Sequence, residues 1–405
     1  MKVYLLIAVI AAMLAIACEM ADDVKTQFPL NDSEQSESTE ETPKSEGETS
    51  SNDHPDVTTA TPEPESSAQA DEDSPLSSGL SIGGFPSLRL TTDPGADQDP
   101  AWDPRDTTIA FMTSKPNALE RPFDIGSVSR NGADLTTMAI GPNSGIGIAG
   151  ELAWVGTTGK LMTNERVGIH SYMTFDTDQA PFTRTTNGDD DAFTRNLIIP
   201  GGQGGDGLSV SRDGGTVMWM IRNSHDPSSY VVEVRIAEIA SLTGQSANEA
   251  GRVLFTHSAA TDGPDFNRGF GLSPDGEEFV VSLKSGDGYD LFLMDSATGA
   301  EIAQLTNIGA SAGEYNLYPE ISPDGDWVAF SSQSDSNARA DIAVVMTNGT
   351  TFAKVTDTED VSEMRPSWSP EGMEVAYQGQ DYSEADPNWD IYRVPVFGGA
   401  SARLP

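Results

Sequence analysis

Four histidines are the side chains of this sequence best suited to acid–base catalysis or metal binding: His54, His170, His225 and His257. No local motif connects them with a nucleophile, because HExxH is absent and the segment GLSVS from Gly207 lacks the final glycine of a GxSxG elbow. A Ser-His-Asp set can assemble in space without such a motif, but nothing in the sequence points to one. We therefore expect binding, and not catalysis, to be the function of this chain.

Calcium binding is the second chemistry to consider, because aspartates are concentrated in two segments. Asp189, Asp190 and Asp191 follow one another, and the segment DPGADQDPAWDPRD spreads five more: Asp93, Asp97, Asp99, Asp103 and Asp106. Calcium takes several carboxylate and carbonyl oxygens from a compact loop, although neither segment has EF-hand spacing. A calcium site at Asp189–Asp191 is the one metal hypothesis, and a solvated acidic loop is the alternative that we favour. No other cofactor is expected.

A ten-residue phrase recurs along the chain and shows which elements must position any site. ISPDGDWVAF (321–330) has near-copies in LSPDGEEFVV from Leu272 and WSPEGMEVAY from Trp368. Six anchor residues, each just before the turn, follow one another at spacings of 52, 56, 62, 49 and 47 residues: Trp102, Trp154, Val210, Leu272, Ile321 and Trp368. An apolar residue stands seven positions after each anchor. A repeat of about 50 residues is typical of propellers and solenoids.

Each repeat predicts four antiparallel strands. In the SPDG turn the proline fixes φ, the aspartate accepts hydrogen bonds from local amides and the glycine takes a positive φ, so the flanking strands pair as a hairpin. An aspartate leads the third strand in four repeats: Asp124, Asp290, Asp341 and Asp390. HSYMTF and YVVEVRI are the expected third strands of repeats 2 and 3, and segments such as AQLT and AKVT form fourth strands. Four-stranded units stacked around an axis make an all-β propeller.

The first strand of each propeller blade lines the central channel, so the residues three or four positions before each anchor should meet at one mouth: Asp99, Glu151, Asp206, Arg268, Tyr318 and Arg365. Such a set can form a polar pocket for a peptide or a sugar. A hydrated channel with ion pairs between neighbouring blades is the alternative that we favour. The anchor tryptophans, and the aromatic residues nine positions beyond anchors, predict core between blades: Phe111, Trp219, Phe330 and Tyr377.

With these motifs, SPDG, IAF-like, DIY-like and LT, the sequence resembles the propeller of TolB and its relatives over residues 86–405. The resemblance implies six blades, each of four antiparallel strands. TolB also has an N-terminal α/β domain, which nothing here matches. Some TolB-like propellers resemble oligogalacturonide lyases, which use histidine ligands and a metal around the axis, so a carbohydrate-active propeller is the alternative function. The related prolyl-oligopeptidase group carries a hydrolase domain after the propeller, and we do not expect a peptidase in a chain that ends at Pro405.

Two segments compete to close the ring. LRLTT (Leu88–Thr92) and the C-terminal ASARLP both match the fourth strand of a repeat. Either the N-terminal segment is the closing strand of the sixth repeat, or it adds beside the C-terminal one. A third possibility is that LRLTT is only the end of the preceding segment.

The N-terminus predicts export and a lipid anchor. Residues 1–17 contain one lysine and an apolar run too short for an ordinary membrane span, followed by Ala17-Cys18. AIAC resembles a bacterial lipobox, which implies lipidation of Cys18, the only cysteine. Residues 18–84 are rich in Ser, Glu, Thr and Pro and predict a disordered acidic tether. Residues 85–405 are the propeller, and Glu19 favours the outer membrane over the inner one.

Charge limits the partners. The net charge of −40 repels phosphate backbones, so we do not expect nucleic acid as a partner. The leading hypothesis is therefore a lipid-anchored, exported, monomeric propeller that acts as a non-enzymatic scaffold for a protein or peptide of the cell envelope.

Overall fold

The computed structural model describes residues 81–114, 124–138, 148–166, 170–176, 183–184, 198–199, 204–222, 231–242, 251–258, 269–307, 309, 313–335 and 338–398. Their regular elements are β-strands and one short 3-10 helix, η1 (Ile239–Ser241). The chain divides into two compact units, Met1–Ala70 and Asp71–Pro405, and all described residues lie in the second. Within them, no helix is long and apolar enough to cross a membrane. The expected signal segment and most of the expected tether lie outside the described residues.

The first three repeats form separate antiparallel sheets. Repeat 1 contains β3 (Asp97–Trp102), β4 (Thr108–Thr113), β5 (Asp124–Ser129) and β6 (Thr136–Met138). Repeat 2 contains β7 (Ile148–Trp154), β8 (Lys160–Arg166), β9 (His170–Asp176), β10 (Thr183–Arg184) and β11 (Ile198–Ile199). Repeat 3 contains β12 (Gly204–Val210), β13 (Thr216–Arg222), β14 (Val231–Glu238) and β15 (Arg252–Ser258). The predicted third strands of repeats 2 and 3 are confirmed as β9 and β14.

Repeats 4 and 5 have the same internal order and share one continuous sheet. Repeat 4 contains β16 (Phe270–Leu272), β17 (Glu278–Ser285), β18 (Gly288–Asp295) and β19 (Glu301–Gln304). Repeat 5 contains β20 (Tyr315–Ile321), β21 (Trp327–Gln333), β22 (Asp341–Met346) and β23 (Phe352–Lys354). A single parallel pair, Tyr289 with Tyr315, joins the two repeats.

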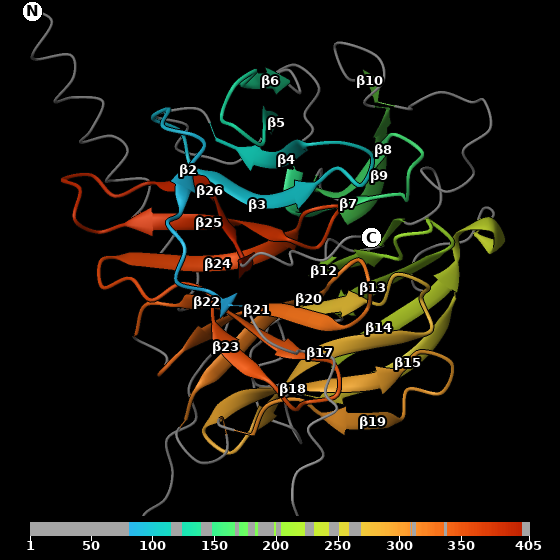
Figure 1. Ribbon diagram of the computed structural model, residues 1–405. Coiled ribbons are helices and arrows are strands. Elements are labelled where there is room, and N and C mark those ends of the chain that lie inside the picture. Colours follow the sequence, from blue (N-terminus) through green and yellow to red (C-terminus); the bar gives the residue numbers. More distant parts are fainter. Residues whose placement is uncertain are drawn as a thin grey trace, which may run out of the picture. The chain divides into compact units, whose positions relative to one another are not determined.

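Repeat 6 takes its fourth strand from the N-terminal side of the chain. It contains β24 (Val361–Trp368), β25 (Glu374–Asp381), β26 (Trp389–Pro395) and β2 (Leu88–Arg89), in the sheet order β2-β26-β25-β24. Figure 1 shows blue β2 beside red β26. A separate two-stranded pair joins β1 (Ser81–Ile82) to β27 (Phe397–Gly398). Of the two closures expected from the sequence, the N-terminal one is therefore present, and ASARLP lies outside the described residues.

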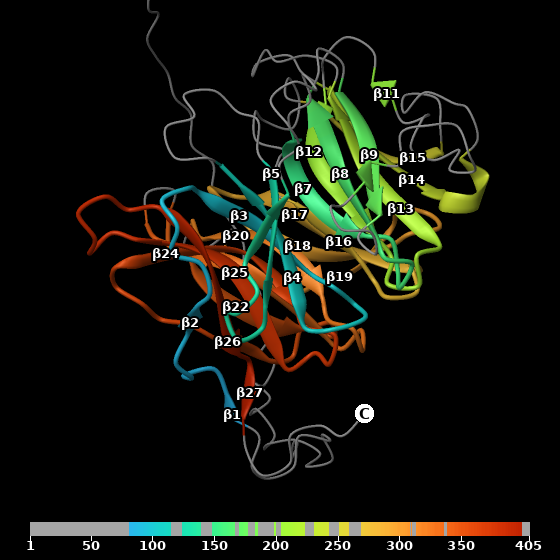
Figure 2. The same cartoon turned by 90° about the horizontal axis from the view of Figure 1, so that it is seen from above.

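The first strands of the six repeats contact one another in a closed cycle. In the described part of the chain, β3 contacts β7, β7 contacts β12, β12 contacts β16, β16 contacts β20, β20 contacts β24, and β24 returns to β3. Figure 2 shows these repeats from above. A cycle of this kind leaves no first strand with an uncovered face.

The recurring turn depends on a serine as well as on Pro, Asp and Gly. In repeat 4, the Ser273 hydroxyl donates to Asp275 Oδ1 at 2.6 Å and accepts the amide of Glu278 at 3.0 Å. The turn glycine, Gly276, has a φ of 74°. Ser322 makes the same two contacts in repeat 5, and Ser211 makes them in repeat 3. The serine thus fixes the carboxylate that caps the turn, a role that the sequence interpretation missed.

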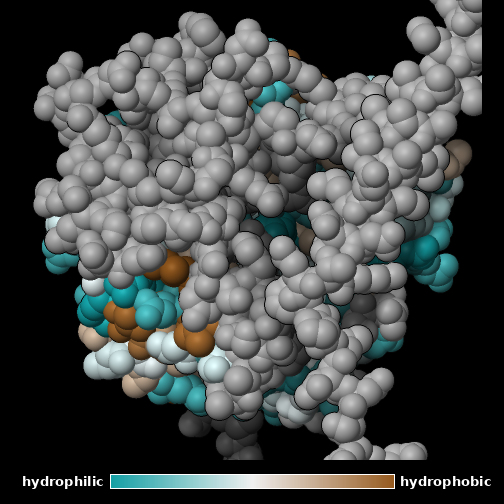
Figure 3. Space-filling view, turned by 180° about the vertical axis from the view of Figure 1, so that it is seen from behind, coloured by the Kyte–Doolittle hydropathy of each residue, from teal (hydrophilic) through white to brown (hydrophobic). Residues whose placement is uncertain are grey.

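Apolar side chains of neighbouring repeats pack together and form the core. One cluster contains residues of β13 and β14 from repeat 3 and of β16 and β17 from repeat 4. A second lies between repeats 4 and 5, and a third lies between repeats 5 and 6. The aromatic residues predicted as core are at most 1% exposed: Phe111, Trp219, Phe330 and Tyr377. Large apolar residues that remain exposed include Ile302 and Val253. In the coloured part of the face in Figure 3, apolar and polar residues lie side by side. Burial of these faces is the main stabilising term.

A threonine after each described fourth strand of repeats 4 to 6 attaches that strand to the third one. The hydroxyls of Thr306, Thr356 and Thr91 accept the amides of the residue after the leading aspartate, at 3.0, 2.8 and 3.0 Å. Thr306 and Thr91 also donate to Asp290 and Asp390. Asp290 and Asp390 therefore have a structural role.

Each of these threonines faces a buried polar residue five positions before the next anchor: Asn316, Glu363 and Asp97, all at most 1% exposed. Asn316 donates its amide to Tyr289 O at 3.1 Å and to Thr306 Oγ1 at 3.4 Å. Glu363 is hydrogen-bonded to Thr356. Thr91 and Thr113 lie near Asp97, but neither carboxylate oxygen of Asp97 has a hydrogen bond of ordinary geometry. Asp97 and Glu363 are thus buried acids at positions where the equivalent repeat has the neutral side chain of Asn316.

Burial raises the pKa of Asp97 to about 8 and that of Glu363 to about 7. Asp93 contributes to the shift of Asp97, and Asp341 to that of Glu363. The folded state therefore keeps protons that the unfolded chain loses near pH 4. Between the unfolded pKa near 4 and the folded pKa of each group, the free energy of unfolding falls as the pH rises, by about 1.4 kcal/mol per pH unit for each group.

We predict that Asp97→Asn weakens this pH dependence, because it places an amide where repeat 5 has Asn316. The variant should gain stability relative to the wild type as the pH rises from 5 to 8, in urea unfolding of the full chain. Asp287→Asn, at an exposed turn position, is the matched control and should follow the wild type. Parallel curves for Asp97→Asn and the wild type would contradict the assignment of a protonated Asp97.

Candidate functional site

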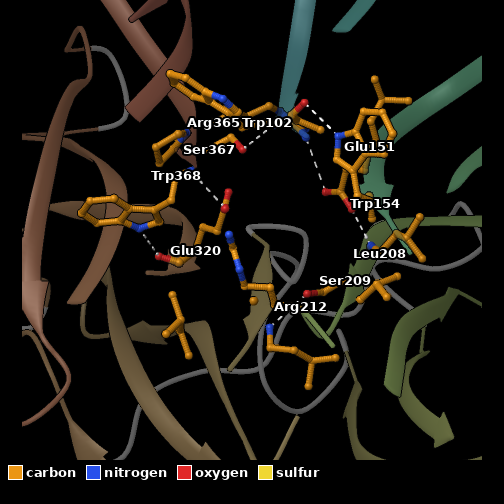
Figure 4. A pocket seen from close by; sticks show the side chains of 18 of the residues that line it. Trp102, Glu151, Trp154, Leu208, Ser209, Arg212, Glu320, Arg365, Ser367 and Trp368 are labelled. Carbon is orange, nitrogen blue, oxygen red and sulfur yellow. Dashed lines mark hydrogen bonds and ion pairs between the residues drawn. The ribbon is translucent and has the colours of Figure 1, made fainter. Parts of the chain in front are cut away.

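A cavity of about 200 Å³ lies among the first strands of all six repeats. Its lining residues belong to β3, β7, β12, β16, β20 and β24 and to the turns that follow them. Figure 4 shows the side chains that point into it. The six strands approach one another here, so residues at equivalent positions of different repeats form successive layers around the cavity.

The layer three residues before the anchors has an unusual backbone. Asp99, Glu151, Tyr318 and Arg365 have φ values of 52°, 36°, 54° and 55°, and the equivalent residue of repeat 4 is Gly269, with a φ of 87°. Non-glycine residues rarely adopt this left-handed conformation, which costs about 1–2 kcal/mol each. Strand pairing shifts register at these positions in repeats 1, 2, 5 and 6. Each bulge redirects one side chain toward the cavity, since bulges re-aim side chains next to functional sites.

These side chains form one ionic network across the mouth of the cavity. Arg365 Nη1 lies 2.7 Å from Asp99 Oδ1 and 3.4 Å from Glu151 Oε1. The guanidinium of Arg365 also lies over the ring of Tyr318, 4.4 Å from its centroid. Glu151 Oε2 accepts the amide of Leu208 at 2.5 Å. The network connects repeats 5, 6, 1, 2 and 3, so the ion pairs between blades that the sequence suggested are present.

The structure brings together four of the six residues predicted for the channel mouth: Asp99, Glu151, Tyr318 and Arg365. Asp206 lies on β12, but only its backbone is described. Arg268 lies outside the described residues. The same holds for the three residues of the calcium hypothesis, Asp189, Asp190 and Asp191, and for the expected lipidation site, Cys18. Binding by any of these residues therefore stays a prediction.

A second layer, one residue before the anchors, carries a side chain that the sequence interpretation missed. Ser209 Oγ accepts the amide of Leu272 at 3.0 Å, and Ser367 Oγ accepts the amide of Trp102 at 3.1 Å. In repeat 5, Glu320 Oε1 makes the same contact, with the amide of Trp368 at 3.1 Å. A carboxylate thus performs a task for which the equivalent positions use a hydroxyl (Figure 4).

The environment of Glu320 disfavours its charged form. Protein atoms surround the carboxyl group, and this burial raises its pKa to about 7 in spite of the Trp368 amide and the Arg212 guanidinium. Arg212 follows β12 and donates to Pro370 O at 3.0 Å. Burial lowers the pKa of Arg212, while Glu320 and Glu371 oppose that effect. Perturbed groups that face a cavity mark candidate functional sites.

The one histidine whose side chain the structure describes does not face this cavity. His257 is buried on β15, the outer strand of repeat 3, and His170 lies at the start of β9. His257 does not line the cavity, only the backbone of His170 is described, and His225 lies outside the described residues. Among the described residues, no group of three or more His, Cys, Asp or Glu side chains is arranged to hold a metal ion. His257 therefore gives no support to a lyase-type metal site at this cavity.

No protein-family model matches this chain, and no curated protein matches it. Among solved structures, it is similar to TolB from Acinetobacter baumannii at 16% identity, over 77% of this chain and 65% of that one, with a TM-score of 0.44. It is also similar to an oligogalacturonate lyase in complex with manganese, at 10% identity over 78% and 96% of the two chains and a TM-score of 0.45. A puromycin hydrolase matches at 12% identity over 76% and 54%, with a TM-score of 0.47.

These structural neighbours are β-propeller proteins, TolB among them. The similarity to them concerns the fold, and the identities of 10–16% transfer neither a substrate nor a partner. The chain spans less than two thirds of the TolB and hydrolase chains that it matches.

The left-handed layer generates a prediction at Tyr318. Tyr318→Gly and Tyr318→Ala both remove the ring under Arg365, but only glycine adopts a positive φ without strain. We expect the glycine variant to be more stable than the alanine variant by about 1 kcal/mol in urea unfolding. The same pair of substitutions at Glu301, an exposed strand residue with ordinary φ, should show the reverse order. Greater stability of the alanine variant at position 318 would mean that no strain is stored there.

Proposed function

We propose that this chain is a six-bladed β-propeller that acts as a non-enzymatic docking module for a protein or peptide of the cell envelope, held at the membrane by a lipid on Cys18. The proposal rests on one observation: charged side chains of several repeats converge on the central cavity, where three of them and Tyr318 are held in strained backbone conformations. Strain of this kind persists only where the surrounding structure imposes it, and it is concentrated at binding and catalytic sites.

The size of the cavity favours a narrow occupant. About 200 Å³ is small beside the roughly 300–1,000 Å³ of sites that enclose a whole small-molecule ligand. A single side chain or a chain end fits this volume, with the remainder of the partner resting on the rim. An oligosaccharide bound along its length requires a longer cleft, so the size supports a peptide over the carbohydrate alternative.

Charge supports a partner with a basic surface. A net charge of −40 creates a long-range field that attracts cationic proteins and accelerates their encounter. The same field repels nucleic acid and other copies of this chain, which agrees with a monomeric propeller.

Site-specific photocrosslinking in cells of the source organism tests the docking site. A photoreactive amino acid at Leu152, which lines the cavity, should trap one discrete protein, and the crosslink should be lost when Arg365→Glu is added. The matched control is Ile302, 49% exposed on the outer strand β19, which should not trap that protein. Trapping of the same protein from Ile302 but not Leu152, or cleavage of an oligogalacturonide by the purified chain, would refute the docking proposal.

The lipid anchor has its own test. Cells grown with an alkyne-labelled fatty acid should label the wild-type chain and not the Cys18→Ser variant, because Cys18 is the only cysteine. The labelled protein should sediment with the outer membrane. Equal labelling of both chains, or recovery of the unlabelled wild type in the soluble fraction, would refute the anchor.

A further inference from the structure

Glu320 is the ionisable member of a layer that is otherwise small and neutral. At the positions one residue before the anchors, the other repeats have Ala101, Ala153, Ser209, Gly271 and Ser367. Because Ser209 and Ser367 satisfy the neighbouring amide with a hydroxyl, the ring does not need a carboxylate at this place. The Trp368 amide donates to Oε1 of Glu320, and the carboxylate lines the cavity, where a hydroxyl in the equivalent repeats satisfies the same amide.

The charges that face this carboxylate do not neutralise it fully. Arg212, after β12, is the one cation that acts on it, and Arg212 is itself shared with Glu371 and with the carbonyl of Pro370. From β24, only the Trp368 amide and the Ser367 hydroxyl interact with it. At the mouth, Arg365 is engaged by Asp99 and Glu151. The described charged residues of the lining are thus three acids and two arginines.

We propose that Glu320 receives a lysine ammonium group from the partner segment that enters the cavity. This inference rests on the docking function proposed above and specifies its ligand chemistry. An ammonium needs one carboxylate and can also lie against indole rings, of which Trp102, Trp154 and Trp368 line the cavity. A metal ion needs several ligands, and the described residues offer no such group here.

Binding of this kind is linked to a proton. The pKa of Glu320 is about 7, so most of the Glu320 carboxyl groups are protonated at pH 6 and must lose a proton when lysine binds. At pH 8 few of them carry a proton. The ionised fraction of a group with that pKa rises from roughly one tenth to nine tenths across this range, while lysine stays charged. The affinity for lysine should therefore rise about tenfold between pH 6 and pH 8.

The test uses three acetylated and amidated tripeptides, Gly-X-Gly, in which X is lysine, norleucine or glutamate, titrated against the full chain by calorimetry at pH 6, 7 and 8. We expect the lysine peptide to bind more tightly than the other two, with the tenfold rise, and to release protons at pH 7 in buffers of different ionisation enthalpy. Glu320→Ser, which installs the residue of the equivalent repeats, should weaken lysine binding about tenfold or more and remove the pH dependence. Glu320→Gln should do the same.

Glu363→Gln is the matched control. Glu363 is also a buried acid with a pKa of about 7, but it does not line the cavity, so this variant should bind the lysine peptide as the wild type does. Equal binding of the norleucine peptide, no measurable lysine binding, or lysine binding that survives in Glu320→Ser would each overturn the inference. Crosslinking from Leu152 would stand in all three cases, so failure of this inference is distinguishable from failure of the docking function.

Discussion

Closure of the ring is the constraint on which the rest of this structure depends. Each sheet has two faces that must be covered, and neighbouring repeats cover both faces of every sheet only when they close into a cycle. The cycle is fixed at one place, where Leu88 and Arg89 pair with β26 and Leu90 donates its amide to Ile391 O at 2.7 Å. Arg89 also forms an ion pair with the buried Asp390. This short strand connects the sixth repeat to the first, whose β3 also contacts β24, β25 and β26.

The similarity of the repeats makes their differences informative. Where one solution satisfies the structure in several repeats, a costlier residue in another repeat needs a reason. Ser209 and Ser367 show that Glu320 is not required by the backbone, and Gly269 shows that Asp99, Glu151, Tyr318 and Arg365 are not the residues that the left-handed backbone prefers. Both departures face the same cavity. Violations of local rules that share one place are expected at functional sites.

Much of this architecture could be predicted from the sequence because the same turn residues recur in successive repeats. Constant offsets from the anchors located the hairpins, the buried aromatic residues and four of the residues at the cavity mouth. The closing strand could not be chosen, since LRLTT and ASARLP carry the same pattern and only pairing distinguishes them. Glu320 was missed because an isolated glutamate in a chain of net charge −40 resembles solvated surface. Asp97 was named only as one of five aspartates in an acidic segment, and its burial was not predicted, because burial is decided by the neighbouring repeat, which a local pattern does not contain.

The position of β2 in the sixth repeat has a consequence for biosynthesis. Arg89 and Asp390 are separated by 301 positions, so the partner of the closing strand is synthesised long after that strand. Until then, β3 and its neighbours form an open arc with an unpaired edge at each end, and such edges pair readily with other chains. Non-local pairing of this kind is slow. Closure of the ring is therefore a late step in folding, and the edges of the open arc need protection from other chains until it occurs.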